Sequence, residues 1–425
     1  MKKYNPRLLL VLKLLALVSL GILTAGCDHN LAQSPGVTKK KIHLGSVLVL
    51  QGQDEAIGNG MRLGIEAALA GERVQGRSLE ISFKNDYYEP ASARQATLEL
   101  LEEEDIFLAL GNVGTPTAKL TLPILTQHNI PAVGFFTGAR LLRENASPLI
   151  VNYRASYEQE IATVIKMALA AGVTPEEVCA YIQNDSYGLD ALENLKQTLA
   201  QAGASKEIIA GYDQVLQATG DYPSGTLRDR NNIGPVGIYT RNTLKSEPGY
   251  NSLKNWESQS GNKCKLVVTA ATYRNLTYFA KKSQEEANKW IISALSFTGA
   301  DELRWDLSEY NVTEGVIMTQ VVPLLNSELP IVKSARSALG KNLGVISLEG
   351  YVVGKMVLKI LRDIPGELTT ENFLQQVQKS RFNLGGIPID FTDGDNQGAD
   401  LIIVSQIKPE GFQKIELLDF ASMVK

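Results

Sequence analysis

The sequence predicts an α/β protein made of two doubly wound, Rossmann-like lobes. Strand-like and helix-like segments alternate from about residue 42, and the same alternation starts again after about residue 155. Such alternation is typical of βαβ units, in which helices cover both faces of a parallel sheet. A single doubly wound sheet rarely needs so many units, so we expect two lobes.

In the first part of the body, short apolar runs predict strands, and apolar residues at i, i+3 and i+4 predict helices. Strands are expected over 42–50, 79–83, 106–110 and 131–136. Helices are expected between them, with apolar faces over 61–69, 93–101 and 117–128. The second lobe then begins with an expected helix over 161–168, a strand over 178–182 and a helix over 192–199.

The stretch 212–263 is less regular. It is rich in Gly, Pro, Asn and Ser, and we expect an insertion there with a short helix near 253–257. Beyond it, strands are expected over 266–270 and 291–295, helices over 346–363 and 370–380, and strands over 401–407 and 413–418. Cys179 lies in an expected strand and Cys264 directly precedes another, so the two form either a disulfide or separate buried thiols.

Composition and charge exclude several classes of protein. The chain is 44% hydrophobic and 21% charged, which argues against disorder. A formal net charge of -4 argues against nucleic-acid binding, which needs a positively charged surface. The sequence has no nucleophile–base motif, P-loop or zinc motif. We therefore expect no enzyme, no cofactor and no metal site.

Three glycines, Gly58, Gly60 and Gly64, resemble a dinucleotide-binding fingerprint. Their spacing differs from it by one residue, and they lie past the strand–helix turn in which the fingerprint needs them. We interpret them as structural glycines. Asp393 and Asp395 resemble a calcium loop without its final Glu, so a tight turn is expected there.

The N-terminus has the features of a secretory signal. Basic residues precede an apolar stretch, and the sequence LTAGC, which ends at Cys27, resembles a bacterial lipobox. This implies a signal peptide over 1–26, lipid on the sulfur of Cys27 and a flexible tether over 27–41. Asp28 resembles the signal that keeps lipoproteins on the inner membrane. We expect a protein anchored to the bilayer on the periplasmic side; an ordinary cleaved signal or an uncleaved anchor are the alternatives.

Candidate binding residues lie where the expected parallel strands end, which is where open α/β sheets bind ligands. Thr115 is the expected N-cap of a helix that follows a buried strand, and the free N–H groups there attract an anion such as a carboxylate. Simple helix capping by Thr115 is the alternative. Phe136 ends the next strand and belongs either to the site or to the core. Three second-lobe loops, 184–188, 272–274 and 296–298, also follow strands.

Taken together, several segments resemble the type I periplasmic binding proteins, and most closely the leucine/isoleucine/valine-type substrate-binding proteins of ABC importers. The segments are IHLGSVLVLQGQ, KNDYYEPASARQA, ALGNVGTPTAKLTLPILTQHNIPAVGFFTGA, YIQNDSYGLDALENLKQTLAQAG and SLEGYVVGKMVLKIL. The resemblance implies two lobes joined by three crossover strands that close on a ligand by a hinge. Lobe 1 would comprise 42–153 plus 323–383, and lobe 2 would comprise 154–322 plus 384–425.

The resemblance also implies roles for individual residues. The hydroxyl of Thr115 would meet a ligand carboxylate, and Tyr187 would cover the ligand from the second lobe. The other positions that match binding loops are Gln51, Phe136, Thr137, Gly138, Thr272, Tyr273, Ser296 and Phe297.

The chain departs from the family at one position. Amino-acid-binding members commonly place an acid in the second lobe to pair with the ligand ammonium, whereas this sequence has Ser296 and Phe297 there. A buried unpaired ammonium is costly. An α-amino acid ligand therefore requires Asp185, Asp301 or a neighbour to replace that acid. The aromatic residues Phe136, Tyr187, Tyr273 and Phe297 are equally compatible with an aromatic or largely apolar carboxylic acid as the ligand.

The sequence thus predicts a lipoprotein that captures a small, carboxylate-bearing solute and delivers it to a membrane ABC permease. Two alternatives remain open. One is a sensor that passes closure to a membrane kinase or cyclase. The other is a lipoprotein without a ligand that regulates cell-wall synthases, which an occluded cleft would favour.

Overall fold

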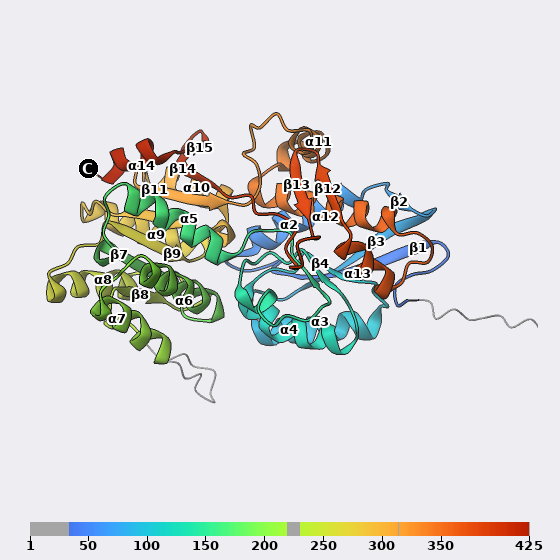
Figure 1. Cartoon of the computed structure of the whole chain (residues 1–425), viewed down its shortest axis with the longest axis horizontal. Helices are drawn as coiled ribbons and strands as arrows, with labels where there is room; N and C mark the ends of the chain where they lie inside the picture. The colour runs from blue at the N-terminus through green and yellow to red at the C-terminus, as the bar shows by residue number, and fades with distance from the viewer. Residues whose placement is uncertain (1–33, 219–229, 313, 425) are drawn as a thin grey trace, which may run out of the picture. The chain divides into compact units, whose positions relative to one another are not determined.

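The computed structural model describes residues 34–218, 230–312 and 314–424. The expected signal peptide, Cys27 and most of the expected tether lie outside the described residues. From Pro35 onward the chain forms one compact unit that contains two large sheets (Figure 1). None of the described helices combines the length and the apolar character that a bilayer crossing needs.

The first sheet has six strands within the described residues, in the order β2-β3-β1-β4-β5-β6. Their bounds are β1 Lys41–Leu48, β2 Arg73–Val74, β3 Arg77–Asn85, β4 Ala109–Leu110, β5 Ala132–Val133 and β6 Ile150–Val151. The sheet is parallel except for β2, which folds back on β3. Its helices are α2 Glu55–Leu69, α3 Pro90–Glu103, α4 Thr115–Gln127, α11 Pro330–Leu339, α12 Val345–Asp363 and α13 Thr370–Gln378. Helix α2 packs on α12, and α3 packs on α4 (Figure 1).

The second sheet has seven strands in the part of the chain that the structure describes, in the order β15-β14-β11-β10-β9-β7-β8. Their bounds are β7 Val178–Gln183, β8 Val236–Tyr239, β9 Leu266–Ala270, β10 Ile291–Ala294, β11 Val316–Gln320, β14 Ile403–Lys408 and β15 Gly411–Lys414. Strands β7, β8, β9, β10 and β11 pair in parallel. Strand β14 pairs antiparallel with β11, and β15 pairs antiparallel with β14. The helices are α5 Tyr157–Ala170, α6 Ser186–Gln201, α7 Lys206–Gln217, α8 Glu247–Ser260, α9 Tyr273–Glu285, α10 Ala300–Glu309 and α14 Leu417–Val424. The two-sheet α/β prediction is confirmed.

The chain passes between the two sheets in segments 152–156, 321–329 and 391–402. A small hairpin of β12 (Arg381–Leu384) and β13 (Ile387–Asp390) precedes the last passage. The hairpin lies beside the first-sheet helices, because Gly385 accepts a hydrogen bond from the backbone N–H of Ile331 at 3.0 Å. We call each sheet with its helices a lobe; the residue bounds of the two lobes stay a prediction.

Two local predictions are wrong. The described part of 212–263 is not an irregular insertion, because it contains strand β8, which pairs in parallel with β7. The helix expected near 253–257 is confirmed as part of the 14-residue helix α8. Strand β8 escaped detection because a four-residue strand leaves little apolar pattern. The strand expected over 413–418 ends at Lys414, and the residues from Leu417 onward form helix α14.

The glycines of α2 have a packing role. A Cβ on Gly64 would lie 2.1 Å from the carbonyl oxygen of Ser347 in α12, and one on Gly58 would lie 2.0 Å from the carbonyl oxygen of Val49. Both distances are far shorter than any real contact, so these positions allow α2 to approach α12 and the end of β1 closely. This agrees with their interpretation as structural glycines.

A disulfide joins Cys179 of β7 to Cys264, which precedes β9; the sulfur atoms lie 2.00 Å apart. The sequence left this pairing open, and the structure contains it. Both residues are buried. Disulfides persist in oxidising compartments. The bond therefore agrees with an extracytoplasmic body.

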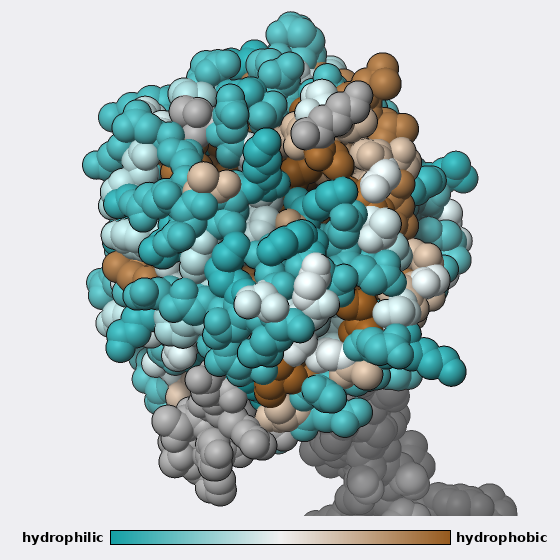
Figure 2. Space-filling view, turned by 90° about the vertical axis from the view of Figure 1, so that its left-hand side faces the viewer, coloured by the Kyte–Doolittle hydropathy of each residue, from teal (hydrophilic) through white to brown (hydrophobic). Residues whose placement is uncertain are grey.

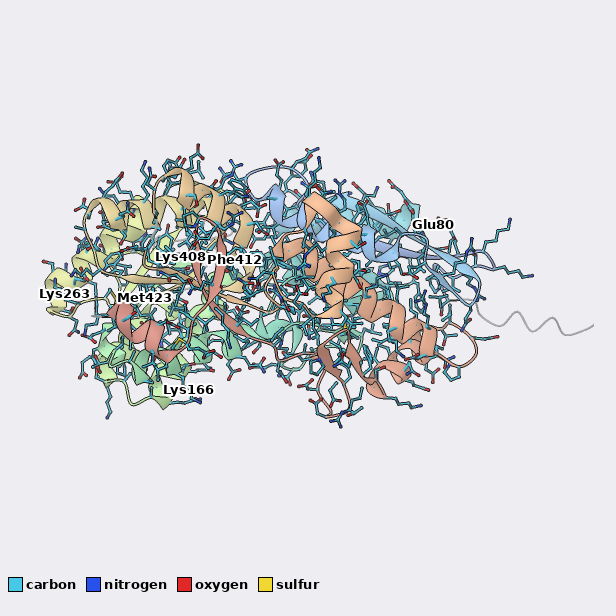
Figure 3. All side chains as sticks on the ribbon, turned by 90° about the horizontal axis from the view of Figure 1, so that it is seen from above. Glu80, Lys166, Lys263, Lys408, Phe412 and Met423 are labelled. Atoms are coloured by element: carbon cyan, nitrogen blue, oxygen red, sulfur yellow. A yellow bond between two sulfur atoms is a disulfide. The ribbon has the colours of Figure 1, made fainter. Side chains whose placement is uncertain are left out.

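Figure 2 shows a largely hydrophilic face with apolar side chains in small groups. Lys408 of β14, Phe412 of β15 and Met423 of α14 lie on the side of the second sheet, whereas Glu80 of β3 lies far from them (Figure 3). Scattered exposed apolar residues are normal for folded proteins and do not by themselves indicate a binding site.

Candidate functional site

In the first lobe, the predicted residues gather where β4 and β5 end. The N-cap of α4 is Gly114 and not Thr115, which is the first residue of the helix. Oγ1 of Thr115 lies 2.7 Å from Oγ1 of Thr137, and both side chains are fully buried. Phe136 is 1% exposed. A Cβ on Gly138 would lie 2.7 Å from the ring of Tyr157, so glycine is needed for this close approach. The sheet edge thus presents two hydroxyls beside an aromatic ring.

In the second lobe, the predicted residues lie where β7, β9 and β10 end. Tyr187 is in the first turn of α6, Tyr273 begins α9, and Phe297 sits in a short 3-10 helix. Asp185 accepts a hydrogen bond from the backbone N–H of Tyr187 at 2.9 Å and thereby caps α6. These residues, together with Thr272 and Ser296, are buried.

Phe297 connects the two groups. Its ring centroid lies 5.6 Å from that of Phe136, 5.9 Å from that of Tyr88 and 4.7 Å from that of Tyr187. Such separations are favourable for aromatic pairs. We call these four residues the aromatic cluster; it contains rings from both lobes. Gln51 is exposed and lies outside the cluster, and its binding role stays a prediction.

Tyr88 reaches the cluster from an unusual turn. Tyr87 and Tyr88 have φ angles of 54° and 57°, in the left-handed region that non-glycine residues rarely adopt. The carboxylate of Asp86 accepts a hydrogen bond from the backbone N–H of Tyr88 at 2.8 Å and supports this conformation. Such strain costs on the order of 1–3 kcal/mol per residue and tends to persist at functional sites.

A buried ion pair lies next to Phe136. Nε and Nη2 of Arg154 contact the two carboxylate oxygens of Glu349 at 2.8 and 2.7 Å. The side chains are 1% and 3% exposed. Burial opposes the charge of Arg154, but the Glu349 carboxylate outweighs it and raises the pKa of Arg154. The guanidinium also lies 4.2 Å from the centre of the Phe136 ring, a cation–π geometry.

Glu160 of α5 holds the loop after β10. Its carboxylate accepts hydrogen bonds from the backbone N–H of Ser296 at 2.9 Å and from Oγ of Ser296 at 2.8 Å, and a third from Thr319. Burial raises the pKa of Glu160. The hydroxyl of Ser296 is therefore engaged within the second lobe, where it positions the neighbouring Phe297.

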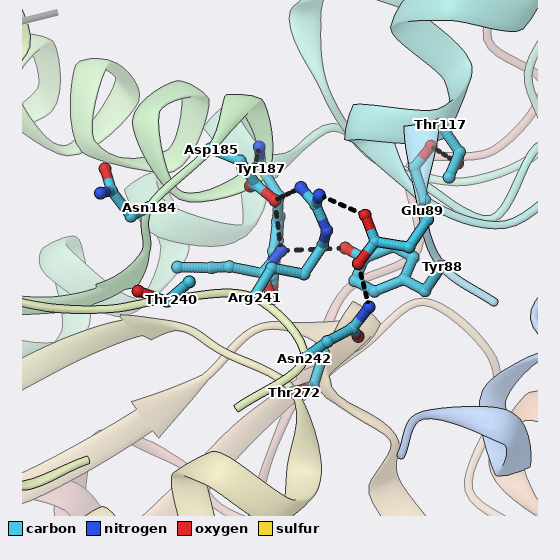
Figure 4. A network of polar contacts seen from close by, with 12 residues as sticks. Tyr88, Glu89, Thr117, Asn184, Asp185, Tyr187, Thr240, Arg241, Asn242 and Thr272 are labelled. Atoms are coloured by element: carbon cyan, nitrogen blue, oxygen red, sulfur yellow. Dashed lines mark hydrogen bonds and ion pairs between the residues drawn. The ribbon is translucent and has the colours of Figure 1, made fainter. Parts of the chain in front are cut away.

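A polar network joins the lobes beside the aromatic cluster (Figure 4). Arg241, which follows β8, contacts Asp185 of its own lobe at 2.8 Å and Glu89 of the first lobe at 2.9 Å. Nδ2 of Asn242 donates to the same Glu89 carboxylate at 2.6 Å. We call these four residues the latch. Gln183 links it to the cluster, because its Nε2 donates to Asp185 at 2.7 Å and to the hydroxyl of Tyr88 at 3.2 Å.

The two acids named above as possible partners of a ligand ammonium are both engaged. Asp185 is part of the latch. Asp301 accepts a hydrogen bond from the backbone N–H of Val345, at the start of α12, at 2.6 Å. Each of these two carboxylates thus already has a partner within the protein.

Several residues at the site were not predicted from the sequence: Tyr88, Arg154, Tyr157, Glu160, Arg241 and Glu349. Arg154 lies in a crossing segment and Tyr88 in a turn, so neither follows a strand end as the predicted residues do. The run Asn85–Glu89 did carry a turn signal, because Asn and Asp side chains commonly accept a hydrogen bond from the backbone N–H two residues on, as Asn85 and Asp86 do here.

Replacement of Glu349 by Gln is expected to lower the free energy of unfolding by about 3–5 kcal/mol, because it leaves the buried charge of Arg154 without a partner. The double variant Arg154→Met/Glu349→Leu should recover most of this loss. Urea denaturation measures both. Arg381→Met is the control, since it removes an exposed ion pair with Asp390 and should change stability by less than about 1 kcal/mol. A Glu349→Gln loss no larger than the control would contradict the role given to the buried pair.

Comparisons with known proteins agree with this architecture. The sequence model of a family described as "Periplasmic binding protein" matches residues 41–231. The Leu/Ile/Val-binding protein homolog 6 of Brucella suis biovar 1 (strain 1330) is 26% identical over 194 residues, which make up 45% of this chain and 47% of that protein. The match thus spans about half the length of this curated relative.

Solved structures extend the similarity over the body. A possible leucine/isoleucine/valine-binding protein from Rhodopirellula baltica SH 1 has a TM-score of 0.78 at 29% identity, covering 89% of this chain and 97% of that chain. A branched chain amino acid ABC transporter from Thermus thermophilus with bound valine has a TM-score of 0.71 at 15% identity, covering 89% and 96%. The chain therefore resembles the type I periplasmic binding proteins in its fold, and residues 41–231 match the sequence model of a periplasmic binding protein family.

Proposed function

We propose that the protein captures a small, carboxylate-bearing solute between its two lobes and delivers it to a membrane ABC importer. The solute is either an amino acid or an aromatic or apolar acid. The observation that carries the proposal is the convergence of strand-end residues from both sheets on the aromatic cluster. No bond is made or broken; a ligand that contacts both lobes shifts the population towards the closed form.

The first lobe offers the features that recognise a carboxylate. The hydroxyls of Thr115 and Thr137 lie together at the N-terminus of α4, where free N–H groups and the helix dipole favour an anion. The aromatic cluster beside them suits the apolar remainder of such a ligand.

The latch and the aromatic cluster are the contacts that closure forms. Arg241–Glu89 joins the lobes through charge, and the hydroxyl of Tyr273 donates to the backbone carbonyl of Gln53 at 2.7 Å. These contacts are absent from any form in which the lobes separate. They therefore stabilise the closed form without themselves requiring a ligand.

We also propose that the protein works on the periplasmic side of the inner membrane, anchored by lipid on Cys27. The LTAGC sequence and the disulfide support an exported lipoprotein. Intact-mass spectrometry of protein extracted from its host membrane is expected to give a chain that begins at Cys27 and carries acyl groups. A Cys27→Ser variant should lose them, and an unmodified Cys27 in the wild type would contradict the anchor.

One observation favours a second candidate function. Phe136 and Tyr187 both pack on Phe297, and all three side chains are at most 1% exposed, so these rings are covered by the protein itself. A protein that closes in this way without a ligand fits a lipoprotein that regulates a partner, such as a cell-wall synthase.

Ligand binding separates the two candidates. Native mass spectrometry of the purified protein, followed by calorimetry with amino acids and with aromatic and aliphatic acids, is expected to reveal one bound solute class. Thr115→Val should weaken binding about 10- to 150-fold, since one hydrogen bond to a charged group contributes about 1.5–3 kcal/mol. Thr117→Val is the control, because Thr117 donates to backbone carbonyls within α4's own lobe. Absence of any bound solute and of any response across the panel would favour the second candidate.

A further inference from the structure

A carboxylate of the second lobe lies on the N-terminus of a first-lobe helix. Oδ2 of Asp301, in the first turn of α10, accepts a hydrogen bond from the backbone N–H of Val345 at 2.6 Å. Val345 is the first residue of α12, and the first N–H groups of a helix have no partner within that helix. The N-cap residue, Gly344, has no side chain to accept them. Asp301 therefore supplies, from the opposite lobe, a partner that α12 lacks.

The glycine before Val345 leaves room for this carboxylate. Gly344 has a φ of -140° and a ψ of 178°, an extended backbone conformation that any residue adopts. A Cβ at this position, however, would lie 2.4 Å from Oδ2 of Asp301, far closer than a real contact. The three atoms nearest to that Cβ all belong to the Asp301 carboxyl group. A side chain of the other lobe thus explains why position 344 needs a glycine.

Neighbouring contacts hold Asp301 against the first lobe. A Cβ on Gly299, the N-cap of α10, would lie 2.9 Å from the ring of Tyr273 and 3.5 Å from the side chain of Ile57 in α2. The hydroxyl of the same Tyr273 donates to the backbone carbonyl of Gln53, which precedes α2, at 2.7 Å. The starts of α9 and α10 are thus packed on the starts of α2 and α12.

The position of the Asp301 carboxylate is electrostatically favourable. Helix α12 has 19 residues, and its aligned peptide dipoles place partial positive charge at the N-terminus. An acid there stabilises the helix end and accepts one of its free N–H groups. The same helix carries Glu349, which pairs with Arg154 of the crossing segment. Asp301 therefore acts on the helix that also anchors this segment, and it does so only while the lobes touch.

This contact is separate from the latch. Asp301 follows strand β10, whereas Arg241 of the latch follows β8, and strands β9 and β7 lie between these two in the sheet. The two contacts also reach different parts of the first lobe, since Glu89 precedes α3 and Val345 begins α12. The lobes are thus joined at two separate places along the carboxyl edge of the second sheet.

We propose that Asp301 is a positioning residue that locks the closed form and thereby sets the affinity for solute without contacting the solute. We call Asp301, Gly344 and Val345 the α12 lock. The inference rests on the proposed capture by closure and deepens it, because it names a residue that decides how readily the lobes close. Since the partner of Asp301 is backbone, the lock contributes equally whichever solute is bound.

A double-mutant cycle across the cleft tests the α12 lock. Asp301→Ala removes the carboxylate, Gly344→Ala places a methyl group where the carboxylate lies, and a double variant combines the two. Asp301→Asn keeps an oxygen acceptor, and Glu309→Ala is the matched control, because it removes an exposed acid from the same helix. Spin labels on the exposed positions Gln95 of α3 and Glu207 of α7 report the ratio of closed to open lobes without solute. Melting temperatures show that each variant folds, and calorimetry measures its affinity for the solute that the wild type binds most tightly.

We expect Asp301→Ala to lower the ratio of closed to open lobes about fivefold, because loss of a helix cap changes an equilibrium by roughly that factor. Gly344→Ala should lower the ratio at least as much, since its methyl group displaces the carboxylate. The double variant should be no worse than Asp301→Ala, because the methyl group then meets no carboxylate. Asp301→Asn and Glu309→Ala should stay within about twofold of the wild type. Solute affinity should fall in the same order across the variants.

Other results overturn the inference. If Gly344→Ala lowers the ratio as strongly with Asp301→Ala as without it, the two positions act independently and Asp301 is no lock. If Asp301→Ala lowers the melting temperature and leaves the ratio unchanged, Asp301 stabilises only its own lobe. Either result leaves the proposed capture of a solute standing, because the ratio is measured without solute. A wild type that binds no solute although the cycle shows the expected coupling would count against the proposed function alone.

Discussion

The buried ion pair of Arg154 and Glu349 fixes the part of the protein on which the site depends. Arg154 lies in a segment that joins the two sheets, and Glu349 lies near the start of α12, which packs on α2. Because an unpaired charge there is costly, the pair holds the crossing segment against the first lobe. The same guanidinium covers Phe136, which in turn packs on Phe297. The same ion pair therefore stabilises both the crossing segment that contains Arg154 and the aromatic cluster that contains Phe136.

In the second lobe, buried carboxylates hold the residues that face the first lobe. Glu160 holds Ser296 and thereby Phe297, and the Asp185 carboxylate both caps α6 and pairs with Arg241. The direct contacts between the lobes are of two kinds. Aromatic packing depends little on salt, whereas the Arg241–Glu89 pair is partly exposed and weakens as salt screens it. The free energy of closure therefore has an apolar part from the aromatic cluster and an electrostatic part from the Arg241–Glu89 pair.

Much of the fold followed from the sequence because parallel strands are buried and leave clear apolar runs. The strand over Leu266–Ala270 was predicted with the bounds it has, and the glycines of α2 were correctly separated from a cofactor motif. Short edge elements such as β8 leave too little pattern. At the candidate site, the rule that ligands bind at strand ends led to Thr115 and Phe297, whose binding roles stay predictions. That rule had no means of locating Arg154 or Glu160, whose importance arises from partners far away in the chain.

The central claim is that a solute drives the two lobes together at the aromatic cluster and the latch. Spin labels on Gln95→Cys in α3 and Glu207→Cys in α7, both exposed positions, report the separation of the lobes. Pulsed dipolar spectroscopy should give a broad distribution of distances without solute. Saturation with the tightest-binding solute should narrow it towards the short distance. A distribution that stays unchanged while that solute is bound would contradict the account.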